Sequence, residues 1–126
     1  DGSYAWPSPY KINANGHATY GMIGDSRGHV WIANRGIGGE TIQCIETDKN
    51  NGETSVNVIT AYTYSSGSVY GIGMDKNGGI YTANYDSGEV YQFSPLATDS
   101  CPTIPMIPVQ TLSTGGGHAR GVAVDQ

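Results

Sequence analysis

The side chains best suited to bind a ligand lie in the connections of this chain, where two histidines occupy equivalent places. His17 and His118 each stand in a Gly-His-Ala triplet, and His29 is the third histidine. Two imidazoles from equivalent loops could converge on a metal or act as acid and base. Neither has a second histidine or a carboxylate at metal-ligand spacing, so we predict no metal site and no catalytic residue. The alternative to ligand binding is that both are solvated loop imidazoles.

Two further ligand candidates open turns that differ between otherwise similar segments. Arg35-Gly-Ile-Gly-Gly39 is one such turn, and Tyr85-Asp-Ser-Gly88 is the other. Loops that recognise a ligand differ in this way, as do loops under no constraint. No cofactor is expected, because the glycines at 115–117 lack the helix and lysine of a phosphate loop. The candidate ligand-binding residues are therefore His17, His118, Arg35 and Tyr85.

An internal repeat with a period of about fifty residues provides the elements that position these side chains. The segment 20–34 opens with Tyr-Gly-Met-Ile-Gly-Asp and returns at 70–84 as Tyr-Gly-Ile-Gly-Met-Asp, and a third copy starts at 120–125. Such a period indicates stacked supersecondary units. Turn residues recur in every unit, whereas an active site occurs once. We therefore interpret as scaffold the repeated residues Asp25, Gly28, Asn34, Asp75, Gly78, Asn84 and Asp125.

Each repeat begins with a predicted β-hairpin. Short β-prone runs at 30–33 and 80–83 follow runs of small and apolar residues at 21–24 and 71–74. Asp at the first position and Gly at the fourth position of the intervening turn are typical of a type I turn closed by a left-handed residue. The Asp side chain can accept hydrogen bonds from the backbone of its own turn, and Asn34 and Asn84 are expected to bond the turn that follows.

Two more strands complete each predicted unit. A third strand is predicted at 41–45 and again at 90–93, with Cys44 aligned to Phe93, and an outer strand at 56–60 and 109–112. The units are therefore four-stranded antiparallel meanders. We predict one partial domain over 1–126, with an outer strand of a preceding unit in 1–19, whole units over 20–69 and 70–119, and the first strand of a following unit in 120–126.

The repeat resembles that of NHL-type β-propellers. Gly71-Ile-Gly-Met-Asp75 and its aromatic strand ending Ala83-Asn84 are similar to the family pattern, as is Arg120-Gly-Val-Ala-Val-Asp125. Streptogramin lyases and regucalcin-like lactonases share this type of repeat. The resemblance implies an all-β fold in which each unit is a propeller blade. It covers nearly the whole chain, but its motif residues are turn and core residues.

The number of units predicts an incomplete propeller. A closed propeller has at least four blades, and the segments found here amount to two complete blades, one outer strand at the N-terminal side and one inner strand at the C-terminal side. We therefore expect a propeller fragment whose partners are the remaining blades of the same propeller or neighbouring subunits.

Charge and cysteine content limit the partners and the compartment. The net charge is −5, with 6 Lys and Arg against 11 Asp and Glu, which argues against a nucleic-acid partner. No apolar run approaches the roughly 20 residues of a membrane-spanning helix. Cys44 and Cys101 are the only cysteines, and an even count permits one disulfide in a secreted or periplasmic protein. Two reduced cysteines are the alternative.

These observations favour a non-enzymatic binding or structural module of a secreted NHL-like propeller, with a protein or carbohydrate ligand on one face. One alternative is part of a propeller enzyme of the streptogramin lyase or lactonase kind. Another is a subunit of an extracellular filament or surface assembly, in which strand addition completes open blade edges.

Overall fold

The structure is a computed structural model that describes residues 18–35, 40–46, 57–65 and 67–125. These residues form eight β-strands and contain no helix. The strands are β1 (Ala18–Gly24), β2 (His29–Arg35), β3 (Thr41–Glu46), β4 (Asn57–Thr63), β5 (Val69–Met74), β6 (Ile80–Asn84), β7 (Glu89–Phe93) and β8 (Gln110–Ser113). The outer strand predicted within 1–19 falls almost wholly outside the described residues.

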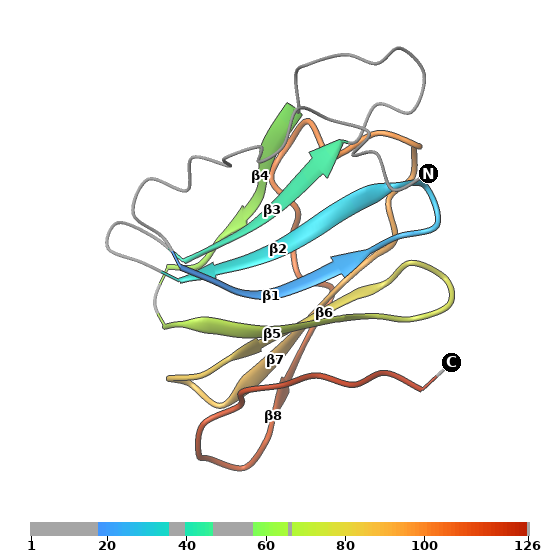
Figure 1. Ribbon diagram of the computed structural model, residues 1–126. Coiled ribbons are helices and arrows are strands. Elements are labelled where there is room, and N and C mark those ends of the chain that lie inside the picture. Colours follow the sequence, from blue (N-terminus) through green and yellow to red (C-terminus); the bar gives the residue numbers. More distant parts are fainter. Residues whose placement is uncertain (1–17, 36–39, 47–56, 66, 126) are drawn as a thin grey trace, which may run out of the picture.

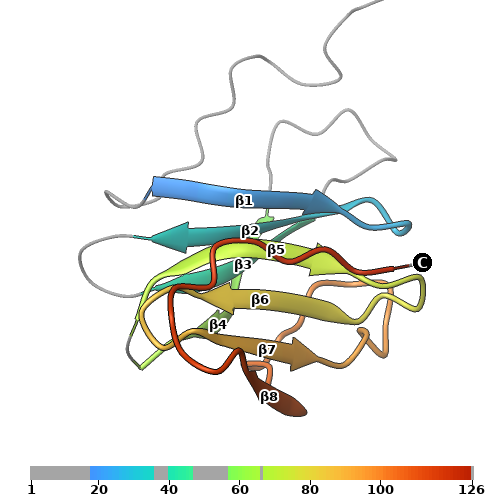
Figure 2. The same ribbon diagram turned by 90° about the horizontal axis from the view of Figure 1, so that it is seen from below.

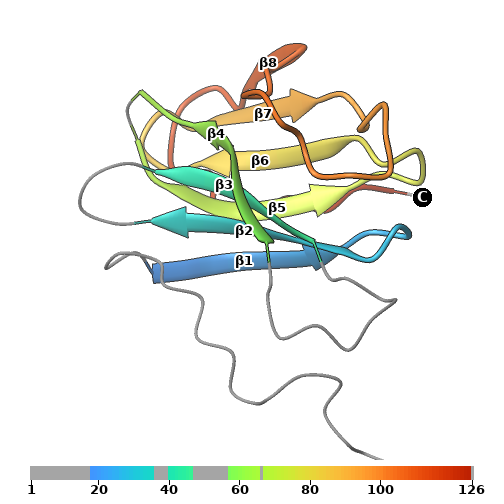
Figure 3. The same cartoon turned by 90° about the horizontal axis from the view of Figure 1, so that it is seen from above.

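The strands form two antiparallel four-stranded sheets, and each sheet follows the order of the chain (Figure 1). The first sheet has the order β1-β2-β3-β4, and the second has the order β5-β6-β7-β8. The views from below and above show the two sheets lying against each other, with β1 and β2 next to β5 (Figures 2 and 3). The all-β class and the two four-stranded units are therefore confirmed. Neither sheet closes on itself.

The core lies between the two sheets and contains side chains from both. Trp31 and Phe93 are its largest fully buried side chains. The Tyr62 and Phe93 rings meet edge to face at 5.1 Å, and the buried Tyr64 hydroxyl bonds the Thr82 hydroxyl. Burial raises the pKa of Tyr64. The buried cluster consists of Trp31, Ala33, Ile42, Cys44, Ala61, Tyr64, Val69, Ile80, Phe93 and Cys101.

Glycines let the first strand of one repeat lie directly against the first strand of the next. A Cβ on Gly21 would stand 2.9 Å from the Tyr70 carbonyl oxygen, and a Cβ on Gly71 would stand 2.8 Å from the Gly121 Cα atom. Such distances are too short for any larger residue. The third repeat therefore lies beside β5 in the same way that β5 lies beside β1.

The prediction of a strand in 120–126 is not matched, because residues 120–125 form no strand. A strand exists through a hydrogen-bonded neighbour. The described residues provide no second strand of the third repeat with which this segment could pair.

The predicted alignment of Cys44 with Phe93 is wrong by one residue. Cys44 pairs with Trp31 in the first sheet, and the equivalent Tyr81 pairs with Gln92 in the second. Ile45 is therefore the counterpart of Phe93. Because side chains alternate between the faces of a sheet, Cys44 lies on the face opposite to that of Ile45, the counterpart of Phe93. Cys44 accordingly faces the second sheet.

The segment 94–109, here called the strap, leaves β7 and crosses to the first sheet before it enters β8 (orange in Figure 1). A disulfide joins Cys101 of the strap to Cys44 of β3, with a Cα–Cα distance of 5.8 Å and a sequence separation of 57. The Cys101 amide donates to a Glu46 carboxylate oxygen at 2.8 Å, and the Met106 amide donates to the Ala61 carbonyl at 2.7 Å. The second repeat is thus attached to the first by a covalent bond as well as by packing.

Replacing both cysteines with alanine should lower the free energy of unfolding by about 2–4 kcal/mol, because the disulfide limits the entropy of the unfolded chain. Urea unfolding of Cys44→Ala/Cys101→Ala, followed by tryptophan fluorescence, measures this. Ser100→Ala, an exposed change in the strap, is the matched control and should leave the midpoint unchanged. An unchanged midpoint for reduced wild-type protein would contradict the expectation.

Candidate functional site

The repeated aspartates hold the tight turns between the first two strands of each repeat. The Asp25 Oδ1 atom accepts hydrogen bonds from the Arg27 and His29 amides, each at 2.9 Å. Asp75 Oδ1 accepts from the second and fourth residues after it at 2.8 and 2.9 Å. Gly28 and Gly78 close the turns with φ angles of 90° and 87°. These contacts are those of the predicted scaffold turns.

The other repeated candidates differ in their surroundings. Asn84 is buried, and its Oδ1 atom accepts from the Asp86 and Ser87 amides at 3.2 and 3.3 Å, as a turn-bonding residue would. Asn34 instead donates to Gln43 Oε1 of the neighbouring strand at 2.7 Å, and the turn after Arg35 lies outside the described residues. Asp125 is exposed at the edge of the described chain.

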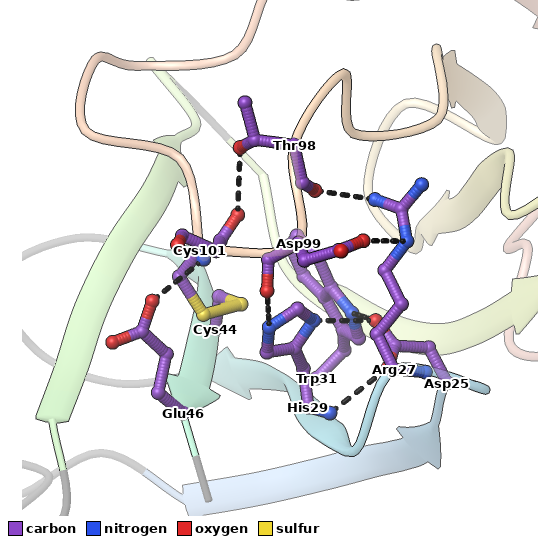
Figure 4. The surroundings of a disulfide bond; sticks show 10 residues. Asp25, Arg27, His29, Trp31, Cys44, Glu46, Thr98, Asp99 and Cys101 are labelled. Atoms are coloured by element: carbon purple, nitrogen blue, oxygen red, sulfur yellow. Dashed lines mark hydrogen bonds and ion pairs between the residues drawn. A yellow bond between two sulfur atoms is a disulfide. The ribbon is translucent and has the colours of Figure 1, made fainter. Parts of the chain in front are cut away.

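A buried histidine that sequence reasoning left unassigned lies at the turn end of the first sheet. The His29 Nδ1 atom is 2.8 Å from Asp25 Oδ2, and its Nε2 atom is 2.9 Å from the Asp99 carbonyl oxygen of the strap (Figure 4). Because both neighbours are acceptors, both bonds form only when the ring carries a proton on each nitrogen. The Trp31 indole also donates to Asp25 Oδ2, at 3.1 Å. Only comparison with the second repeat, where glycine stands at 79, marks His29 as unusual in the sequence.

Arg27 adds a second attachment between this turn and the strap. Its guanidinium donates to the Leu96 carbonyl at 3.0 Å. It also donates to the Thr98 carbonyl and lies 3.3 Å from an Asp99 carboxylate oxygen (Figure 4). The surroundings of the disulfide are therefore a network that joins the first hairpin turn, β3 and the strap.

Two catalytic or metal-binding interpretations of this end of the molecule fail on geometry. Residues 24–28 spell Gly-x-Ser-x-Gly, but Ser26 lies in a β-hairpin turn rather than between a strand and a helix. Both nitrogens of the adjacent His29 are already bonded elsewhere. His29, Glu46 and Cys101 lie within 4.8 Å of one another, but the Cys101 sulfur is bonded to Cys44, which leaves too few ligands for a metal.

The opposite end of the strands carries a continuous group of aromatic and cationic side chains. The Tyr20 and Tyr70 rings lie with centroids 4.4 Å apart, and the Tyr70 and Tyr85 rings 4.8 Å apart. The His118 ring stacks on Tyr85 at 4.1 Å. We call this group the tyrosine–arginine row; it consists of Tyr20, Arg35, Tyr70, Tyr85, His118 and Arg120.

Two guanidinium groups lie over the tyrosine rings of the row. Arg35 is 5.2 Å from the centroid of Tyr70 and 5.9 Å from that of Tyr20, and it donates to the Tyr70 hydroxyl. Arg120 is 5.2 Å from the Tyr85 centroid and donates to the Tyr85 hydroxyl at 3.3 Å. Such cation–π contacts hold the side chains in place.

The guanidinium groups of the row stay charged. A hydrogen bond with Tyr20 raises the pKa of Arg35, and a hydrogen bond with Tyr85 raises the pKa of Arg120. Among the described residues, neither Arg35 nor Arg120 forms an ion pair. The negative charge of Glu40 also raises the pKa of Arg35, but less than the hydrogen bond with Tyr20 does.

Three of the four predicted ligand-binding residues come together in this row: Arg35, Tyr85 and His118. The fourth, His17, lies outside the described residues. The His118 Nδ1 atom is 3.0 Å from the Tyr85 carbonyl oxygen. Sequence reasoning missed Tyr20, Tyr70 and Arg120, although they occupy the same position in the three repeats. That shared position was the available signal, because equivalent positions of stacked repeats lie next to one another.

Comparison with known protein families, curated proteins and solved structures finds no match to this chain. None of the described residues belongs to a helix long and apolar enough to cross a membrane. The residues of the site themselves therefore carry the information about function.

The Asp25 carboxyl should make the stability of the first hairpin depend on pH. Burial alone would raise its pKa, but hydrogen bonds from Trp31 and His29 outweigh burial and hold the pKa below the usual 3.8. This contribution to stability is present above the unfolded-state value and is lost as pH falls through the lower folded-state value. Asp25→Asn should lower the free energy of unfolding by about 1–3 kcal/mol at pH 7, because His29 and Trp31 would then face a neutral amide in place of a buried carboxylate.

Urea unfolding at pH 7 and at pH 3 measures the effect. The wild-type protein should lose more stability between these two pH values than Asp25→Asn does. Asp75→Asn is the matched control in the more exposed second turn, and its loss at pH 7 should be smaller. Equal pH dependence in wild type and Asp25→Asn would show that this carboxyl does not contribute as described.

Proposed function

We propose that this chain is a non-enzymatic ligand-binding module of a secreted NHL-like β-propeller protein, and that its two sheets are neighbouring blades. Two features support this proposal. Each sheet is a four-stranded antiparallel meander in chain order, and the first strands of successive repeats lie side by side. Both features are expected of blades arranged around an axis.

The tyrosine–arginine row is the observation that carries the binding function. It lies where the first strand of each repeat begins, and in a propeller this is one mouth of the central channel. Tyr20 is 51% exposed, and the row combines rigid rings with fixed guanidinium groups. Aromatic and arginine side chains dominate the energetics of binding surfaces.

The arrangement favours binding over catalysis. General acid–base chemistry needs a positioned pair of titratable groups within reach of a substrate. The described residues of the row include no carboxylate, and the Asp25–His29 pair at the other end is buried and bonded within the scaffold. The disulfide supports an oxidising compartment, as expected of a secreted protein.

Fluorescently labelled protein applied to a printed oligosaccharide array and a printed peptide array tests the proposal. We expect retained signal on at least one array, and a loss of at least about tenfold in affinity for Tyr70→Ala, because Tyr70 contacts both neighbouring rings and Arg35. Lys76→Ala, an exposed change at the opposite end of β5, is the control, and thermal unfolding shows that each variant is folded. Absence of signal on both arrays, or full binding by Tyr70→Ala, would refute the proposal.

A further inference from the structure

The hydrogen bonds within the tyrosine–arginine row leave several of its N–H and O–H donors unused by the described residues. A guanidinium can only donate, so the phenol oxygen is the acceptor in each arginine–tyrosine bond. Each phenol therefore keeps its own O–H hydrogen to donate, and each guanidinium keeps further N–H groups. No hydrogen bond donated by the hydroxyls of Tyr70 or Tyr85 is found among the described residues.

The charge of the row is opposite to that of the chain. The protein carries −5 overall and has only 6 Lys and Arg in total, yet two of those cations stand in this one row with raised pKa values. A set of fixed donors and positive charges on an acidic protein selects a ligand that brings acceptors and negative charge.

We infer that the row binds an acidic oligosaccharide whose sugar units carry carboxylates; this inference rests on the ligand-binding function proposed above. Arginine recognises carboxylates through paired N–H donors, and the phenol hydroxyls match the many oxygen acceptors of a sugar. The two guanidinium groups lie over different rings along the row, Arg35 at Tyr20 and Tyr70, and Arg120 at Tyr85. An extended ligand with repeated carboxylates can meet both.

The observations favour a saccharide over an acidic peptide. Arginine clusters also recognise acidic peptides, but a peptide usually adds anchors in apolar pockets or pairing with a sheet edge. Among the described residues, an apolar groove lies elsewhere, between the second sheet and the C-terminal segment, where Val90, Leu112 and Val122 line it. The row offers rings, hydroxyls and guanidinium groups instead.

Isothermal titration with three probes tests this inference: tetragalacturonate, the same tetrasaccharide with its carboxylates methyl-esterified, and a tetraglutamate peptide. Tetragalacturonate should bind at least about tenfold more tightly than either of the other probes, and its affinity should fall as salt rises, because the contacts are between charges. Arg35→Gln and Arg120→Gln should each weaken binding several-fold. Tyr85→Phe, which removes one phenol donor and keeps the ring, should do the same.

Lys76→Gln is the matched control, because it removes an exposed positive charge at the opposite end of the strands and should leave the affinity unchanged. Equal binding of the esterified probe would overturn the acidic ligand while leaving a binding module. Tighter binding of tetraglutamate would identify a peptide ligand and overturn the saccharide. No binding of tetragalacturonate at millimolar concentration would overturn the inference, whereas the arrays described above decide the binding function separately.

Discussion

The close approach of equivalent strands in successive repeats is the constraint on which the rest of the structure depends. At Gly21 and Gly71 the backbone of the next repeat occupies the space that a side chain would need. This contact brings each residue at the start of a first strand next to its own copy fifty positions later. Tyr20 therefore meets Tyr70, and Tyr85 meets His118 and Arg120 of the repeat that follows.

The two ends of the stacked strands have different chemical characters. At the turn end, His29 and Arg27 bond the strap, Asp25 bonds His29, and the disulfide joins the strap to β3 covalently. Their polar groups are largely hydrogen-bonded within the protein. At the other end, the two arginines donate to tyrosines of the row, and the Tyr70 and Tyr85 hydroxyls donate to no partner among the described residues. A scaffold held firmly at one end can present such groups in fixed positions at the other.

The sequence contains enough information for the strands but not for every contact between them. Gly and Asp at fixed offsets marked the hairpin turns, and the eight strands lie close to the expected positions. The alignment of β3 with β7 is wrong by one residue. Cys44 and Phe93 look equivalent by their spacing from the preceding turn, but the backbone pairing makes Gln92 the counterpart of Cys44. The Cys44–Cys101 disulfide matches the one bridge that the even cysteine count permits. His29 and its bond to the strap could not be predicted, since a single buried histidine has no repeated pattern. Repetition alone does not separate Tyr20 and Tyr70 from the scaffold residues, because in stacked repeats it also brings identical side chains together.

The strap has a further consequence for how the two sheets unfold. In arrays of repeats, each unit contributes its own stability and an interface term with its neighbour, so terminal units can open alone. Here the connection between β7 and β8 belongs to the second repeat, yet it is bonded to β3 and to Ala61 of the first. Neither sheet can separate while this cross-link is intact. The pair should therefore behave as one cooperative unit, with Trp31 at the shared interface reporting on both repeats at once.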